Sequence, residues 1–192
     1  MPHVASVHRL DSNRSGLLVV DLQERLVPVI PSGDQVVRQT QRLLKAADML
    51  QVPSAATVQY PKGLGNLVAP LDQWFSHDKN SPEEKLEFSS AVCRQSLDAW
   101  TQAGRDQIVV TGIETHVCIL QTVLDLMAEG CFAYVVAEAV AARHGRDHET
   151  AMDRMRDAGA TIITAESVMF EWLGTADHPQ FKEISKLVKA GV

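Results

Sequence analysis

A cysteine at the start of a predicted helix has the clearest chemical potential in this chain. Cys118 follows the apolar run QIVVTG (107–112) and opens a helical pattern that extends to Ala128. A helix N-terminus carries partial positive charge and free N–H groups, which favour a thiolate and can stabilise an oxyanion. The alternative is a buried cysteine that packs as a small apolar side chain. The local sequence leaves both interpretations open.

Two charged residues upstream are candidate partners for this thiol. Asp21 ends the apolar run GLLVVD, and Lys85 lies in the segment PEEK. An acid just beyond a buried strand is typical of sites in α/β proteins, although it can also cap a helix or face solvent. A nearby lysine would lower the pKa of the thiol, although most lysines are solvated surface charges. His116 precedes Cys118 by two residues and should point in a different direction, so we expect it to line a pocket or the surface.

The order of elements that must position these residues indicates the fold class. Apolar runs at 16–21, 52–58, 107–112, 132–137 and 160–164, with a short strand or turn at 86–90, alternate with helical patterns at 36–50, 96–103, 115–128 and 147–158. This order predicts an α/β protein, a single-domain, doubly wound three-layer α/β/α sandwich with a mostly parallel, Rossmann-like six-stranded sheet. In such sheets ligands bind beyond the carboxyl ends of the strands, where Asp21 and Cys118 fall. We expect residues 1–15 to be an N-terminal extension and residues 16–192 to form the domain.

Composition narrows the functional classes. The 192 residues are 45% hydrophobic and 22% charged, with a net charge of −6. The acidic balance gives no broad attraction to nucleic acid or anionic membranes, so we expect neither as a partner. No apolar run is long enough to span a membrane, and the first 16 residues do not resemble a secretory signal. The three cysteines match no zinc spacing and predict free thiols in the cytoplasm or another reducing compartment.

One segment near the C-terminus concentrates large apolar side chains. The run VMFEWL occupies residues 168–173. If exposed, it would form a patch that a homo-oligomer, a dimer or tetramer, could cover. The alternative is that these side chains cover the sheet of the monomer itself.

Several stretches together resemble a known family. They are LLVVDLQERLVP, TVQYPKGLG, EKLEFSS, VVTGIETHVCILQTVLDLMAEG and VVAEAVAAR. They resemble the isochorismatase-like (cysteine hydrolase) family, and within it the small isochorismatase domain-containing branch. The resemblance extends from about Gly16 to Leu173, and the stretch TGIETHVC in register with VVD and K-x-x-F-S is highly specific.

The resemblance implies roles for particular residues. It implies a catalytic triad of Asp21, Lys85 and Cys118, and a cis peptide bond between Ile113 and Glu114. It also implies an oxyanion hole formed by the N–H groups of Glu114 and Cys118. Proteins of this family commonly assemble through their helical faces, so the resemblance, like the apolar segment, implies a homo-oligomer.

The loop after the second strand departs from one branch of the family. Nicotinamidases carry an aspartate and two histidines there as metal ligands, whereas residues 59–66, QYPKGLGN, offer neither histidine nor carboxylate. We therefore expect no catalytic metal, no other cofactor and no nicotinamidase activity. We expect Gln59, Tyr60 and His116 to line the substrate pocket.

These observations favour a hydrolase that uses a Cys-Asp-Lys triad on a small amide-like or vinyl-ether substrate. Two alternatives remain: a non-catalytic binding or scaffold member of the family, and a nucleic-acid processing enzyme such as a ribonuclease.

Overall fold

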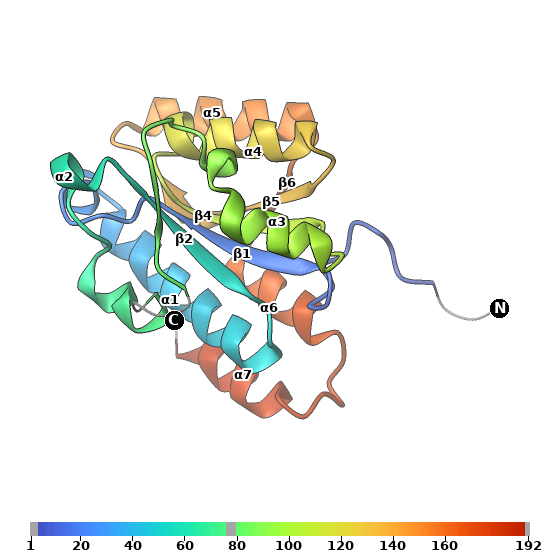
Figure 1. Cartoon of the computed structure of the whole chain (residues 1–192). Coiled ribbons are helices and arrows are strands. Elements are labelled where there is room, and N and C mark those ends of the chain that lie inside the picture. The colour runs from blue at the N-terminus through green and yellow to red at the C-terminus, as the bar shows by residue number, and fades with distance from the viewer. Residues whose placement is uncertain (1–3, 76–79, 191–192) are drawn as a thin grey trace.

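A single parallel sheet forms the centre of the protein. The computed structural model describes residues 4–75 and 80–190. All strand pairs are parallel, in the order β3-β2-β1-β4-β5-β6 (Figure 1). The strands are β1 (Ser15–Val20), β2 (Ser54–Gln59), β3 (Glu83–Lys85), β4 (Gln107–Ile113), β5 (Phe132–Ala141) and β6 (Thr161–Ile163). The predicted fold class is confirmed, and the sheet is parallel throughout.

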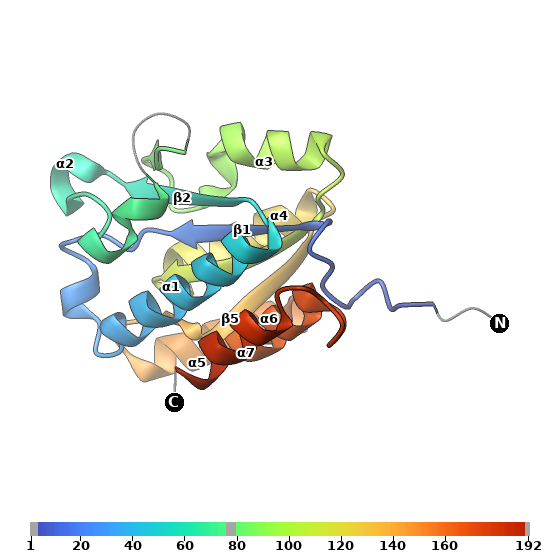
Figure 2. The same ribbon diagram turned by 90° about the horizontal axis from the view of Figure 1, so that it is seen from below.

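Helices cover both faces of this sheet. They are α1 (Gly33–Leu50), α2 (Pro61–Leu64), α3 (Arg94–Gln102), α4 (Leu120–Ala128), α5 (Gly145–Ala158), α6 (Ala165–Leu173) and α7 (Phe181–Lys189). Short turns of helix occur at η1 (Val27–Val29), η2 (Ala69–Trp74) and η3 (Ser90–Val92), and a π-helical turn, η4 (Thr115–Ile119), precedes α4. Helices α3, α4 and α5 lie on one face, and α1, α6 and α7 lie on the other (Figures 1 and 2). Within the described ranges, no helix is both long and apolar enough to cross a membrane.

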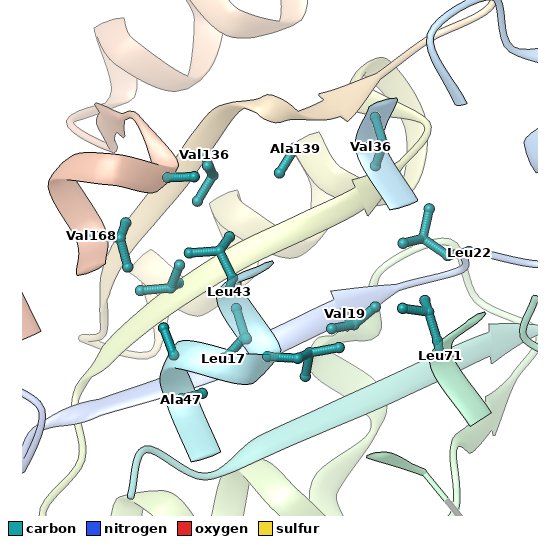
Figure 3. Close-up of a cluster of buried hydrophobic side chains, with 14 of the residues drawn as sticks. Leu17, Val19, Leu22, Val36, Leu43, Ala47, Leu71, Val136, Ala139 and Val168 are labelled. Atoms are coloured by element: carbon teal, nitrogen blue, oxygen red, sulfur yellow. The ribbon is translucent and has the colours of Figure 1, made fainter. Parts of the chain in front are cut away.

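The alternation of side chains along the strands divides the core in two. In β1, Leu17 and Val19 pack on the α1 side, whereas Leu18 and Val20 pack on the α4 side. Figure 3 shows the first cluster, in which residues of β1 and β5 meet Leu43 of α1. Every residue of β1 is buried, as expected for a parallel strand between two helical layers.

The strand order reverses at β1, and this fixes where a site can form. Strand β1 pairs with β2 on one side and with β4 on the other. Connections from the carboxyl ends of β1 and β4 therefore leave toward opposite faces and open a crevice between them. Asp21 follows β1 at this crevice, and Glu114 follows β4.

The edge strand lies earlier in the chain than the sequence indicated. Of the short strand or turn expected at 86–90, the strand is wrong, because residues 83–85 pair with β2 instead and the chain bends at 86–88. Lys85 is paired with Gln59 and is the last residue of this strand. The chain then leaves the sheet, and Leu86 is 72% exposed. Pairing with β2 therefore overrides the low apolar content of the segment.

The apolar segment 168–173 belongs to the core of the monomer. Val168, Met169, Trp172 and Leu173 are buried in the same cluster as α1, and Phe170 is the exposed member. The expected exposed patch is therefore wrong, because α6 turns these side chains toward the sheet.

The residues before β1 pack against the amino end of the sheet. Leu10 is buried, and the Gln107 side chain donates to the carbonyl oxygen of Arg9 and accepts from the N–H of Asp11. Tyr134 donates to the carbonyl oxygen of His8 over 3.0 Å. The division of the chain at residue 15 stays a prediction.

A glycine at the crevice allows β1 and β4 to approach closely, and this predicts a stability difference. Gly112 has φ +125°, and a Cβ there would lie 2.0 Å from the Val20 carbonyl oxygen. Gly130 has φ +89° but open space around it. We expect Gly112→Ala to lower the free energy of unfolding by about 2–4 kcal/mol, because it adds a backbone clash to the strained φ. Gly130→Ala should cost about 1 kcal/mol. Chemical denaturation followed by circular dichroism measures both, and equal losses would contradict the clash.

Candidate active site

A buried ion pair lies at the carboxyl edge of the sheet. Lys85 Nζ is 2.7 Å from Asp21 Oδ2, and both side chains are 0% exposed. The ammonium also donates to Gln59 Oε1 at 2.8 Å and to the Phe88 carbonyl oxygen at 3.0 Å. The Glu87 carbonyl oxygen at 3.3 Å is a fourth acceptor, so four acceptors share the three protons that a lysine ammonium can donate. Lys85 is therefore held by the protein itself and acts on its surroundings mainly through its charge.

The Asp21 carboxylate is the centre of the site. Its Oδ1 accepts a hydrogen bond of 2.9 Å from Thr57 Oγ1, and its negative charge raises the pKa of the neighbouring Cys118 thiol. Asp21 has φ +54°, a left-handed conformation that aspartate adopts more readily than most residues. Such conformations persist where the surrounding structure fixes them, often at functional sites. The structure thus brings Asp21, Lys85 and Cys118 together.

Cys118 lies on the π-helical turn that follows β4. Its thiol is nearly buried, with the residue 6% exposed. The Ile113–Glu114 peptide bond is cis, and the Glu114 N–H favours the thiolate form of Cys118 and so lowers its pKa. The Ile119 N–H reaches back five residues to the Glu114 carbonyl oxygen at 3.2 Å. π-Helical turns occur frequently at functional sites.

The electrostatics of this thiol differ from the sequence-based expectation. Burial, followed by the Asp21 charge, raises the pKa of Cys118 to about 12. Lys85 and the Glu114 N–H lower this pKa, but their effect is smaller. The expected low thiol pKa is therefore wrong for the free protein, because burial and the Asp21 charge together outweigh the effect of Lys85. At this pKa the resting thiol is protonated at neutral pH.

The three residues expected to line the pocket have different surroundings. Gln59 is buried, and its amide binds Lys85 and the Leu86 carbonyl oxygen, so both polar groups are engaged within the protein. Tyr60 is half-exposed and borders a cavity of about 500 Å³ that Lys85 and Leu86 also line. His116 is partly buried, with Nε2 3.9 Å from Asp147 Oδ2. Their contact with a substrate stays a prediction.

Sequence reasoning missed three buried polar residues around the pair. Thr57 binds Asp21, Ser90 lies 3.0 Å from Thr57, and Gln23 binds the backbone of Gln59 at both its N–H and its carbonyl oxygen. The only signal in the sequence is a polar residue inside an apolar run, as at Thr57 in AATVQ. That signal does not indicate which residue the polar side chain contacts in the folded protein.

The described residues show no cluster suited to a metal. In the ranges 4–75 and 80–190, no three His, Cys, Asp or Glu side chains are grouped as potential ligands. The expectation that no catalytic metal is required stays a prediction that rests on the chemistry of residues 59–66.

The sequence of the chain identifies its family. The isochorismatase domain model matches residues 15–167, which include the whole site. The chain is 39% identical over 189 residues to isochorismatase domain-containing protein 2A of Mus musculus, which covers 98% of this chain and 89% of the mouse protein. It is 37% identical over 170 residues to isochorismatase domain-containing protein 1 of Salmo salar, and this match spans 88% of the chain but only 59% of the longer salmon protein. The chain belongs to the isochorismatase family, and to the small isochorismatase domain-containing branch that the sequence resembled.

Solved structures have the same fold. The MAR1 ribonuclease of Caenorhabditis elegans superimposes with a TM-score of 0.87 at 35% identity, over 94% of this chain and 92% of that one. The YcaC gene product of Escherichia coli, described as an octameric hydrolase of unknown specificity, superimposes with a TM-score of 0.80 at 22% identity, over 99% of this chain and 100% of that one. At this second level of identity, the likeness concerns the fold alone.

The electrostatics predict that one substitution makes Cys118 more reactive toward an alkylating agent. Asp21→Asn removes the negative charge beside the thiol and leaves the Lys85 charge, so the pKa of Cys118 should fall from about 12. Alkylation by iodoacetamide should then begin at lower pH than in the wild type. Peptide mass spectrometry measures the rate at each cysteine, and Cys131, whose pKa is raised by burial and by other carboxylates, is the internal control. An unchanged or higher onset pH at Cys118 would contradict the assignment.

Proposed function

We propose that this chain is a cysteine hydrolase that uses Cys118, Asp21 and Lys85 on a small amide-like or vinyl-ether substrate. The observation that carries the proposal is the buried ion pair of Asp21 and Lys85 at 2.7 Å beside Cys118, because the Asp21 charge acts on this thiol and raises its pKa. A nucleophile, an adjacent base and a third group that orients the base are the arrangement that nucleophilic catalysis requires.

The protonated thiol determines the order of events. Cys118 is not a preformed thiolate, so Asp21 must accept the thiol proton as Sγ attacks the substrate carbonyl. The new S–C bond moves the carbonyl electrons onto oxygen, and the N–H groups of Glu114 and Cys118 receive that charge. The protonated Asp21 then donates its proton to the leaving amine as the C–N bond breaks.

Water completes the cycle. Asp21, ionised again, accepts a proton from a water molecule that attacks the thioester carbonyl. As the C–S bond breaks, Asp21 returns this proton to the Cys118 sulfur, which leaves as a thiol, and the acid product is released. Lys85 keeps a positive charge beside Asp21 throughout, which stabilises the ionised carboxylate. For vinyl ethers of the isochorismate type, similar residues act and a covalent step is not required.

The triad predicts large losses of turnover. Cys118→Ala should lower kcat by at least about 10³-fold, because it removes the nucleophile. Asp21→Asn and Lys85→Ala should act in the same direction, although each leaves a buried charge unpaired and can cost about 3–5 kcal/mol of stability. A panel of amides, ureido acids and vinyl ethers supplies the assay, and circular dichroism reports the fold. Cys93→Ala, which removes a buried thiol outside the triad, is the matched control. Turnover of a folded Cys118→Ala variant at the wild-type rate would contradict the mechanism.

A ribonuclease is the second candidate function. The observation that favours it is the name of the C. elegans structure, MAR1 ribonuclease, at 35% identity. The net charge of −6 favours the small-molecule substrate, because binding of a phosphate backbone relies on clustered lysine and arginine. Incubation of a labelled RNA with wild type and Cys118→Ala, across a salt titration, separates the two functions. RNA cleavage that depends on Cys118 would replace the small-molecule hydrolase as the conclusion, whereas no activity in either assay would favour the scaffold alternative.

We also propose that the protein is a homo-oligomer, a dimer or tetramer, in the cytoplasm or another reducing compartment. Exposed apolar side chains at Leu86, Phe88 and Val92 support an assembly that covers them. The free cysteines at 93, 118 and 131 support the reducing compartment.

Sedimentation equilibrium at micromolar concentration tests the assembly. The mass should be a multiple of 21.1 kDa. A mass of one chain over the whole concentration range would overturn the proposal.

A further inference from the structure

A chain of buried hydroxyl groups lies behind the Asp21 carboxylate. Thr57 Oγ1 donates to Asp21 Oδ1 over 2.9 Å, and Ser90 Oγ is 3.0 Å from Thr57 Oγ1. Thr57 has a single hydroxyl proton, which goes to the carboxylate, so Ser90 must be the donor to Thr57. Both hydroxyl residues are 0% exposed. The direction of donation is therefore fixed, from Ser90 to Thr57 to Asp21.

Ser90 also connects this chain to the turn that carries the nucleophile. Its N–H donates to Thr122 Oγ1 at 2.7 Å, and the Thr122 hydroxyl donates to the Cys118 carbonyl oxygen at 2.6 Å. The two ends of this chain of contacts, Asp21 and Cys118, are neighbours, because the Asp21 charge acts directly on the Cys118 thiol. Five buried residues thus make up the chain of contacts from the base to the nucleophile: Asp21 just after β1, Thr57 of β2, Ser90 of η3, Cys118 of η4 and Thr122 of α4. Such networks fix the orientation of their members when every group is satisfied.

We propose that Thr57 and Ser90 are positioning residues for the general base. This inference rests on the proposed cysteine hydrolase. The Thr57 hydroxyl occupies Asp21 Oδ1 and Lys85 occupies Oδ2, so the carboxylate cannot rotate away from the thiol. A donor to a carboxylate also favours its charged form, which is the form that can accept the thiol proton. The Ser90 hydroxyl orients the Thr57 hydroxyl, and the Ser90 N–H connects this pair, through Thr122, to the turn that carries Cys118.

The chain offers a matched pair of threonines for the test. Thr111 is buried in β4, as Thr57 is in β2, but its hydroxyl has no hydrogen-bond partner among the described residues. Thr57→Val and Thr111→Val remove the same atom from similar surroundings. Thr57→Ser restores the hydroxyl without the methyl group. The comparison therefore separates the loss of the hydrogen bond from the loss of packing.

The assay uses p-nitrophenyl acetate, an activated ester that acylates a thiol without needing an acid for its leaving group. The first-turnover release of p-nitrophenolate, corrected with Cys118→Ala, gives the acylation rate from low to high pH. At pH 7, Thr57→Val should lower this rate by about tenfold, the effect of one lost hydrogen bond to a charged group. The acidic limb of its pH–rate profile should also move to higher pH. Thr57→Ser and Thr111→Val should keep the wild-type profile, and Ser90→Ala should shift it in the same direction as Thr57→Val by a smaller amount.

The outcomes distinguish this inference from the proposed function. If the wild type shows no acylation that depends on Cys118, the proposed function fails and the positioning role fails with it. If acylation depends on Cys118 but Thr57→Val has the profile of Thr111→Val, the positioning role alone is overturned. Circular dichroism checks the fold of each variant. If Thr57→Val does not fold, Ser90→Ala is the deciding variant. It keeps the Thr57 side chain in place and removes only the hydroxyl that orients it. A pH–rate profile of Ser90→Ala that equals that of the wild type would then overturn the proposal.

Discussion

The buried ion pair between Lys85 and Asp21 is the constraint on which the site depends. Removing two charges from water is costly, and their attraction offsets this only with good geometry and further hydrogen bonds. Here the pair is 0% exposed, and Gln59, Thr57 and the Phe88 carbonyl oxygen supply those hydrogen bonds. The partners come from the carboxyl ends of β1, β2 and β3 and from the turn after β3. The alignment of these ends in register is therefore a condition for burying the charges.

The same charges define what the cysteine can do. A helix start and a lysine would together favour a thiolate, but burial and the Asp21 carboxylate outweigh them and raise the pKa of Cys118 to about 12. A thiol with this pKa is protonated at neutral pH, so in the proposed mechanism its proton passes to Asp21 only when a substrate carbonyl is in place. This arrangement limits reactions of the thiol with other electrophiles, because thiol reactivity follows the fraction of thiolate.

The sequence by itself determined the elements and the residue types. The runs ending at Asp21 and Gly112 are apolar because both faces of a parallel strand are buried, and this made β1 and β4 readable from local pattern. Helices α4 and α5 could likewise be predicted from local pattern, because each helical pattern ends at a glycine. The family resemblance then singled out Asp21, Lys85 and Cys118 among many charged and thiol residues, and it identified the family correctly.

Only the tertiary structure decided how these groups interact. Strand β3 forms in the polar segment 83–85 because β2 offers it backbone partners, and local sequence carries no record of that pairing. Val168, Met169, Trp172 and Leu173 are buried because α6 meets α1 and the sheet, not because of their order in the chain. The contacts from Ser90 to Thr57 and from Lys85 to Asp21 join residues 33 and 64 positions apart. Burial, charge separation and hydrogen-bond direction depend on such distant neighbours, so the pKa of the thiol and the partners of the carboxylate could be known only from the fold.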